Sequence, residues 1–197
     1  MSTTNPSAQT ALLVMDVQPS TVERYAQNSD LLPRLATTIA AARAATIPVL
    51  YVRVKFGQGY PEVSPRNKMF AGIKQRSSSF PGALMAMEIH PAIAPLPTDM
   101  VVTKLRVSAF AGSDLEVLLR AQDIRHLVLC GIATSGVVLS TLREAADKDY
   151  GLTVLSDCCV DNDEEVQRVL LTKVFPRQAE VITSEQWCET IREKQAL

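Results

Sequence analysis

The sequence predicts an α/β protein, a three-layer α/β/α sandwich built on a mostly parallel six-stranded sheet. Runs that are apolar throughout alternate along the chain with stretches in which apolar residues recur at helical spacing. A strand that is apolar throughout is buried on both faces, as in parallel sheets covered by crossover helices. The alternation of the two patterns therefore places helices on both sides of one sheet.

The first three strands are each predicted from a short apolar run. Residues Ala11–Asp16 and Val49–Val54 form the first two strands. Between them, Leu31–Ala45 repeats apolar residues at helical spacing and forms a helix. The third strand is Met100–Lys104, and a helix over Leu115–Ala121 follows it.

The fourth strand, Leu127–Gly131, ends at a glycine turn that opens a helix. Apolar residues at helical spacing, Val138, Leu142 and Ala145, line one face of that helix. The turn places Thr134–Val137 at a helix N-terminus, where unpaired N–H groups and the helix dipole favour a negative charge. We therefore expect this turn to bind an oxyanion or to hold a nucleophile.

The C-terminal part of the chain repeats the alternation. The fifth strand is Leu152–Ser156, and Glu164–Val174 forms a helix. The sixth strand is Ala179–Thr183, and Ser184 is expected to be the N-cap of a terminal helix.

One region, Lys55–Pro97, departs from this rhythm. It is long for a connection and rich in glycine and proline. Insertions of this kind often contact substrate or another subunit. An equally good interpretation is a solvated connection with a short helix near Asn67–Gln75.

Length and charge limit the function classes. A chain of 197 residues is the size of one domain, and we expect a flexible tail over residues 1–9 and a single domain over residues 10–197. A net charge of −1 gives no electrostatic basis for binding nucleic acid or an anionic membrane. No apolar run approaches the roughly 20 residues that span a bilayer, and residues 1–9 do not resemble a signal peptide.

Cysteine and histidine usage points to a cytoplasmic protein without a metal or cofactor. The four cysteines match no zinc-binding spacing and are interpreted as reduced thiols. Two histidines give little support to a histidine-rich metal site. Gly131 is a lone glycine rather than part of a dinucleotide- or phosphate-binding fingerprint.

Three separated segments carry a resemblance to a known family. In order, they are Ala11–Gln18, Val101–Phe110 and Leu129–Thr141. Together they resemble the isochorismatase-like hydrolases, which implies a Rossmann-like, isochorismatase-like fold, a small-molecule substrate and assembly as a homodimer or homotetramer. Nicotinamidases of this superfamily bind a metal through aspartate and histidine after the second strand. Residues Tyr51–Gly59 contain neither, so the resemblance disfavours that metal site.

The same resemblance implies roles for particular positions. Many members are cysteine hydrolases with an Asp–Lys–Cys triad; Asp16 and Lys104 fall on the first two positions, and Val137 falls on the cysteine. Isochorismatases, which cleave a vinyl ether, also lack this cysteine but have glycine there, so the bulkier valine would narrow the pocket. A cis peptide bond at Ile132–Ala133 is a further implication of the family.

Asp16 is expected to act as a general acid or base, and Lys104 to stabilise developing charge. The structural alternatives are an aspartate that caps a turn and a lysine whose ammonium reaches solvent. Substrate contacts are expected from the residues near this pair: Gln18, Arg106, Ala133, Thr134 and Val137.

Several of these residues also have simpler explanations. Arg106 either holds a substrate carboxylate through a bidentate pair or pairs with an acid at the surface. Gln18 is explained equally well as a solvated loop residue. Ser135 is expected to be an N-cap, and Cys130, inside a strand, an inert buried thiol.

Three functions remain open at this point. The first is a cofactor-free hydrolase in which water attacks directly, beside the Asp16–Lys104 pair. The second is a catalytically silent relative that binds a small ligand or acts as an oligomeric scaffold, as the missing thiol at Val137 suggests. The third and weakest is an amidase that uses Cys130 as a displaced nucleophile.

Overall fold

A computed structural model describes residues 9–27, 29–77 and 87–195 of the chain. The tail predicted over residues 1–9 lies outside the described residues except for Gln9. Within them, a sheet of six parallel strands has the order β3-β2-β1-β4-β5-β6, which confirms the predicted α/β fold. The strands are β1 (Thr10–Met15), β2 (Val49–Val54), β3 (Met100–Lys104), β4 (His126–Ile132), β5 (Gly151–Val160) and β6 (Glu180–Ile182).

The helices agree with the predicted positions to within a few residues, and α1 is an addition to them. They are α1 (Pro19–Tyr25), α2 (Leu31–Ala44), α3 (Lys68–Ser77), α4 (Leu115–Ala121), α5 (Leu139–Asp147), α6 (Glu164–Val169) and α7 (Ser184–Gln195). Shorter helical turns are η3 (Pro91–Ile93), η4 (Thr134–Val138), η5 (Leu170–Val174) and η6 (Phe175–Arg177). None of the helices in the described part of the chain is both long enough and apolar enough to cross a bilayer.

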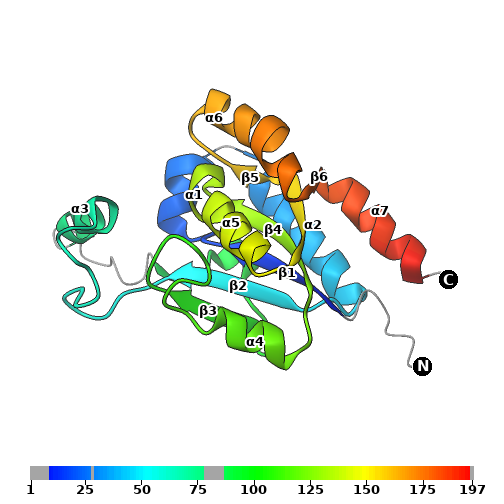
Figure 1. Cartoon of the computed structure of the whole chain (residues 1–197), viewed down its shortest axis with the longest axis horizontal. Coiled ribbons are helices and arrows are strands. Elements are labelled where there is room, and N and C mark those ends of the chain that lie inside the picture. Colours follow the sequence, from blue (N-terminus) through cyan, green and yellow to red (C-terminus); the bar gives the residue numbers. More distant parts are fainter. Residues whose placement is uncertain (1–8, 28, 78–86, 196–197) are drawn as a thin grey trace.

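Helices cover both faces of the sheet (Figure 1). On one face α2 and α7 pack together, and Gln195 donates a hydrogen bond to the Ala44 carbonyl (3.0 Å). On the other face Glu116 of α4 forms an ion pair (2.7 Å) with Lys148, which follows α5, so that these two helices are linked. Polar contacts at the surface therefore join neighbouring helices within each of the two helical layers.

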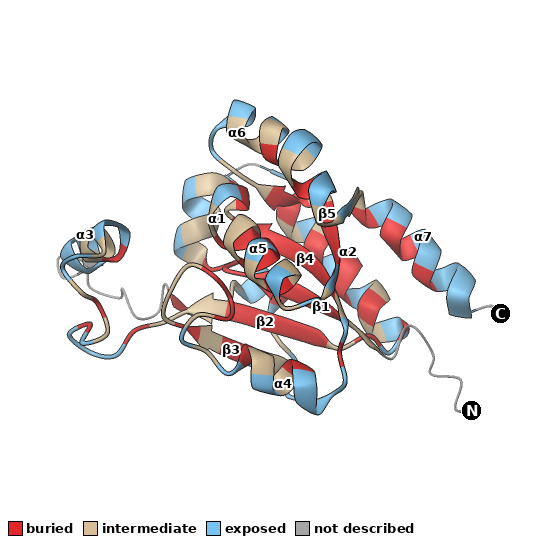
Figure 2. Ribbon diagram, in the orientation of Figure 1, coloured by how far each residue is buried: buried red, intermediate tan, exposed pale blue. Residues whose placement is uncertain are grey.

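Strands β1 and β4 form the buried centre of the sheet. Every residue of Ala11–Met15 and of Leu127–Cys130 has an exposed fraction of 0%. Figure 2 shows the same strands as the continuous buried centre of the molecule. The apolar sequence of these strands is explained by helices that cover them on both sides.

The direction of strand addition reverses between β1 and β4. From β1 the chain moves outward through β2 to β3, and then returns to β4 and moves outward to β6. In open α/β sheets a reversal of this kind leaves a crevice at the carboxyl ends of the strands, where ligands bind. Asp16 follows β1 and Ala133 follows β4, so both lie at the reversal.

The predicted end of the fifth strand is wrong. β5 does not stop at Ser156 but continues to Val160. Its pairing with β4 shifts register between Leu129 and Gly131 and then resumes, with Gly131 opposite Cys159. The shift admits extra residues on β5, which apolar periodicity alone does not reveal.

The predicted N-cap of the terminal helix is also wrong, by one residue. The Thr183 hydroxyl accepts a hydrogen bond from the Gln186 amide (3.3 Å), and the Gln186 side chain accepts one from the Thr183 amide (2.9 Å). This reciprocal pair is a capping box. Ser184 is the first residue of α7 and donates its hydroxyl to Asp157 (2.8 Å).

Gly131 occupies a position that only glycine fits. Its φ is +139°, and a Cβ built there would lie 2.0 Å from the Met15 carbonyl oxygen. Strands β1 and β4 approach each other closely at this point, next to the ends that carry Asp16 and Ala133. The glycine therefore permits the strand spacing that the candidate site requires.

We predict that Gly131→Ala lowers the free energy of unfolding by roughly 2–5 kcal/mol, because the methyl group overlaps backbone and the φ is unfavourable. Gly59→Ala is the matched control, since Gly59 also has a positive φ (+79°) but nothing lies within 4 Å of its added Cβ. This control should lose about 1 kcal/mol. Urea unfolding measures both variants, and equal losses would contradict the steric explanation.

Candidate active site

Asp16 is positioned by the turn that ends β1. Its backbone has a φ of +53°, a left-handed conformation that aspartate tolerates better than most residues. The Asp16 amide donates to the Val52 carbonyl (2.8 Å), and its carbonyl accepts from the Gln18 amide (3.0 Å). The backbone makes this turn, which leaves the carboxyl group free for other contacts.

Lys104 reaches Asp16 from two strands away. β2 separates β3 from β1, a distance of roughly 10 Å at about 4.8 Å per strand. The lysine side chain crosses the end of β2, and its Nζ lies 2.9 Å from Asp16 Oδ2. The predicted contact is confirmed. Because Lys104 is only 2% exposed, its ammonium does not extend to solvent.

The pair is buried, and this changes the acidity of the carboxyl group. Burial raises the pKa of Asp16 above its ordinary value, although the Lys104 ammonium and the nearby Val54 amide lower it. Asp16 Oδ2 is bound by Lys104, whereas Oδ1 has no hydrogen-bond partner among the described residues. A carboxyl group with one unoccupied oxygen and a raised pKa is suited to accepting or donating a proton.

A single wide turn, η4, connects β4 to α5. The peptide bond between Ile132 and Ala133 is cis, as the family resemblance implied. The amides of Gly136 and Val138 both donate to the Ala133 carbonyl (3.0 and 3.3 Å). These two amides are therefore committed to the turn itself, and fewer N–H groups face a ligand than the sequence predicted.

A carboxylate of the protein already occupies this helix N-terminus. Asp161, which follows β5, accepts a hydrogen bond from the Ser135 amide through Oδ2 (2.8 Å). The prediction that Ser135 is an N-cap is wrong, because the cap position is Ala133 and Ser135 lies within the turn. The sequence analysis missed Asp161, because the predicted fifth strand ended at Ser156, whereas β5 continues to Val160.

Thr134 and Val137 are the buried members of the turn that remain candidates for a ligand contact. Thr134 is 0% exposed and its hydroxyl has no hydrogen-bond partner among the described residues. Val137 is 2% exposed and presents only hydrocarbon. One turn further on, the Thr141 hydroxyl accepts a hydrogen bond from the Ala109 amide (2.9 Å), which explains its burial without a ligand.

Gln18 has a structural role rather than that of a solvated loop residue. It is 1% exposed, and its side chain donates to the Val54 carbonyl and accepts from the Val54 amide (both 3.1 Å). These two hydrogen bonds fix the end of β2 against the turn after β1. Lys104 crosses the sheet at the end of the same strand.

The prediction that Arg106 pairs with an acid at the surface is also wrong. Its guanidinium donates to the carbonyl oxygens of Leu105 (2.5 Å) and Glu62 (3.1 Å). It also lies over the ring of Phe70, 5.9 Å from the ring centroid. The Arg106 carbonyl in turn accepts a hydrogen bond from Lys104 Nζ (2.8 Å).

The four cysteines are all buried and reduced. Cys130 donates its thiol to the Leu13 carbonyl (3.3 Å), and burial raises its pKa well above the ordinary value. Burial likewise raises the pKa of Cys158 to about 12 and that of Cys159 further. None of these three thiols has the lowered pKa of a reactive cysteine.

Within residues 9–27, 29–77 and 87–195, no group of three or more His, Cys, Asp or Glu side chains could hold a metal ion. That the protein works without a metal or cofactor stays a prediction.

Comparison with known proteins identifies the family. A model of the isochorismatase domain matches residues 10–186. The chain belongs to the isochorismatase family. An uncharacterised isochorismatase family protein of Bacillus subtilis, YwoC, is 32% identical over 193 residues, 98% of this chain and 100% of that protein. The ureidoacrylate amidohydrolase RutB of Cronobacter sakazakii is 31% identical over 170 residues, 76% of this chain and 73% of that protein.

Solved structures of the family have the same fold. A cysteine hydrolase from Pseudomonas syringae pv. phaseolicola has a TM-score of 0.84 at 25% identity, over 95% of this chain and 94% of that chain. An isochorismatase family protein from Burkholderia thailandensis has a TM-score of 0.81 at 28% identity, over 94% of this chain and 96% of that chain. The family resemblance carried by the three sequence motifs is therefore confirmed.

The Asp16–Lys104 pair makes stability depend on pH. Because the pKa of Asp16 is raised in the folded state, its contribution to stability is complete below its ordinary value of 3.8 and is lost as the pH rises through the folded-state pKa. Lys104→Met removes the group that lowers this pKa. We predict a larger loss of stability with rising pH in this variant, at about 1.4 kcal/mol per unit of pKa.

Urea unfolding between about pH 4 and about pH 8 measures this effect, a range that brackets ordinary carboxyl pKa values. Lys68→Met is the matched control, because Lys68 is exposed on α3. Parallel pH profiles for the two variants would show that Lys104 does not control the ionisation of Asp16.

Proposed function

We propose that the protein is an isochorismatase-family hydrolase in which Asp16 acts as general acid and base and Lys104 stabilises charge. Water attacks the substrate directly, without a cysteine nucleophile. The observation that carries this proposal is the buried Asp16–Lys104 pair, with one carboxylate oxygen unoccupied at the strand reversal. An ion pair buried for structural purposes alone is costly unless its remaining polar atoms are satisfied.

For an amide substrate, Asp16 Oδ1 takes a proton from water while the water oxygen bonds to the carbonyl carbon. The electron pair of the carbonyl bond moves to its oxygen, and the amides of Thr134 and Val137 are the candidates to stabilise it. The C–N bond then breaks, and the leaving nitrogen takes the proton back from Asp16. Lys104 keeps Oδ2 paired throughout, so that the changes in charge occur at Oδ1.

For a vinyl ether the same carboxyl group works in the opposite order. Protonated Asp16 gives its proton to the alkene carbon. Water adds to the resulting cation and returns a proton to Asp16, which gives a hemiketal. The C–O bond to the alcohol then breaks as the hydroxyl proton of the hemiketal passes to the leaving oxygen and a carbonyl forms. The raised pKa of Asp16 supports this step, because it increases the fraction of the acid form near neutral pH. Neither route requires a covalent intermediate.

Two features support direct attack by water. The motif resemblance implies that Val137 falls on the position of the cysteine, and a valine side chain has no nucleophilic atom. Cys130, the displaced alternative, is buried, bonded to the Leu13 carbonyl and shifted to a high pKa. We therefore do not assign the nucleophile to Cys130.

Relatives suggest the first substrates to test. Ureidoacrylate amidohydrolases of several bacteria are similar to this chain, at 31–36% identity. A small acid that carries a hydrolysable amide or ureido group is therefore the proposed substrate class, with vinyl ethers such as isochorismate as the second. We also propose one domain over residues 10–197, a cytoplasmic location, assembly as a homodimer or homotetramer, and no nucleic-acid or membrane partner.

We predict that Asp16→Asn lowers kcat/KM by about 10²–10⁴-fold on any substrate that the wild type hydrolyses, as expected for loss of a general acid or base. Release of ammonia from ureidoacrylate and related ureido acids, and loss of the isochorismate chromophore, are the assays. Asp147→Asn is the control, because Asp147 is exposed at the end of α5. Unchanged turnover in Asp16→Asn would reject the proposed role.

A second function is favoured by Val137 itself. The resemblance implies that this buried hydrocarbon side chain stands at the position of the nucleophile, and this also fits a protein that binds a small ligand without cleaving it or that acts as an oligomeric scaffold. Under this alternative the same acids raise the melting temperature by mass action and are recovered intact. Hydrolysis that requires Asp16 would exclude it.

Substitution at Val137 tests the assignment of this position. We predict that Val137→Cys produces a thiol with a pKa below the ordinary range, because it lies in the first turn of a helix. The rate of alkylation by iodoacetamide as a function of pH measures the effect. Val138→Cys is the control, since the neighbouring residue points about 100° away around the helix. Equal reactivity of the two thiols would show that position 137 does not face the site.

A further inference from the structure

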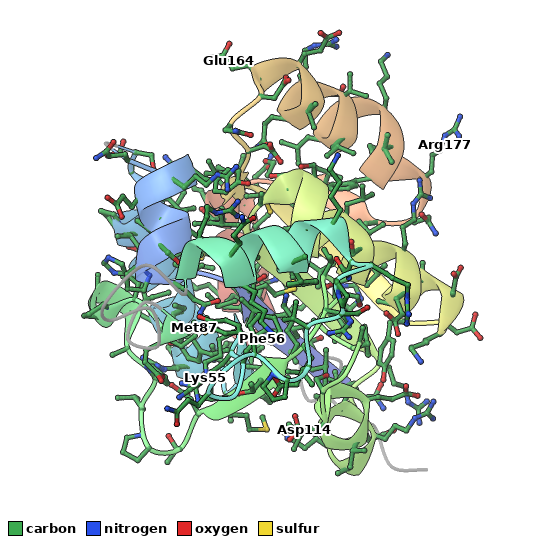
Figure 3. All side chains as sticks on the ribbon, turned by 90° about the vertical axis from the view of Figure 1, so that its left-hand side faces the viewer. Lys55, Phe56, Met87, Asp114, Glu164 and Arg177 are labelled. Carbon is green, nitrogen blue, oxygen red and sulfur yellow. The ribbon has the colours of Figure 1, made fainter. Side chains whose placement is uncertain are left out.

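The lobe formed by residues 55–77 lies at the carboxyl ends of the strands. It leaves the sheet after β2 and carries α3, which stands away from the body of the molecule in Figure 1 and lies across the end of the sheet in Figure 3. The lobe contributes Phe56, Tyr60, Val63 and Phe70 to an apolar cluster that is separate from the main core and that Met87, from beyond the lobe, completes. Figure 3 labels Phe56 and Met87, which lie beneath α3.

Aromatic contacts and ion pairs hold the lobe together. The Phe56 ring lies 5.7 Å from that of Tyr60 and 5.5 Å from that of Phe70, centroid to centroid. At the base of the lobe, Lys55 binds Glu88 (2.6 Å). The lobe is thus a packed unit, and the short helix predicted near Asn67–Gln75 is present in it as α3. That this region contacts a substrate or another subunit stays a prediction.

The loop after β3 connects this lobe to the candidate active site. Leu105 and Val107 pack against the apolar cluster of the lobe. Between them, the Arg106 guanidinium binds the Glu62 carbonyl (3.1 Å) and covers the ring of Phe70. The side chains of the first three residues after β3 therefore contact the lobe and its apolar cluster.

The backbone of the same loop holds the lysine of the site. Lys104 Nζ has two acceptors, Asp16 Oδ2 (2.9 Å) and the Arg106 carbonyl (2.8 Å). The second acceptor fixes the direction from which the ammonium approaches the carboxylate. The side chain of the same residue bridges the Leu105 carbonyl and the Glu62 carbonyl.

We propose that Arg106 is a positioning residue, which clamps the 55–77 lobe to the loop after β3 and thereby holds the Lys104 ammonium against Asp16. A planar guanidinium suits this role, because it donates in two fixed directions to two carbonyl oxygens and stacks on an aromatic face. The proposal replaces the expectation that Arg106 binds a substrate carboxylate. It rests on the proposed function in one respect, namely that Lys104 and Asp16 carry out the reaction.

The test uses two measurements on the full chain, neither of which requires a substrate. Hydrogen–deuterium exchange followed by mass spectrometry reports the stability of residues 57–77. The ¹³C resonance of the Asp16 carboxyl group, assigned by its absence in Asp16→Asn, reports the pKa of Asp16. The variants are Arg106→Met, which removes every donor, and Arg106→Lys, which keeps the charge but not the planar fork. Arg66→Met is the matched control, an exposed arginine in the same lobe.

Arg106→Met should speed exchange in residues 57–77 about tenfold, equivalent to about 1.4 kcal/mol of local stability. It should also raise the pKa of Asp16 toward the value in Lys104→Met, because the ammonium is no longer held in place. Arg106→Lys should restore only part of both effects, and Arg66→Met should resemble wild type.

Three results would overturn the proposal. Exchange in the lobe unchanged by Arg106→Met would show that the arginine is not a clamp. Faster exchange with an unchanged Asp16 titration would leave Arg106 a purely structural role. Full restoration by Arg106→Lys would show that charge, and not the bridge between carbonyls, is what matters. Absence of hydrolysis in every assay would reject the proposed function but would leave these measurements decisive.

Discussion

The ion pair between Asp16 and Lys104 is the interaction on which the candidate site depends. Moving two charges out of water is costly, and good geometry with further hydrogen bonds is needed to offset that cost. Lys104 meets this condition through two acceptors, whereas Asp16 keeps one oxygen without a partner among the described residues. An unsatisfied buried oxygen does not add to stability, and the proposed proton-transfer role of Asp16 gives a reason for it.

The backbone around the pair shows how tightly its position is constrained. Asp16 takes a left-handed conformation, and Gly131 admits the close approach of β1 and β4 because it has no Cβ. Gln18 holds the end of β2, the strand that the lysine side chain must cross. The two charges thus meet because three strand ends are fixed together, and the loops that follow these strands supply the remaining contacts.

The turn after β4 has fewer unpaired backbone amides for a ligand than its place at a helix N-terminus suggests. Asp161 binds the Ser135 amide, and two further amides return to the Ala133 carbonyl. The buried residues of the turn that remain candidates for a ligand contact are Thr134 and Val137.

The sequence by itself determined the fold class, the strands and the residues of the ion pair. Strands that are apolar throughout are buried on both faces of the sheet. Polar residues that end such strands therefore lie at the carboxyl ends of the strands, where ligands bind. Tertiary structure decided the roles of Gln18, Arg106 and Asp161, because each binds backbone atoms that are distant in sequence or belong to another element. In each of these hydrogen bonds the partner of the side chain is a main-chain group. Because almost every residue has such groups, no pattern of side chains in the sequence predicts these contacts.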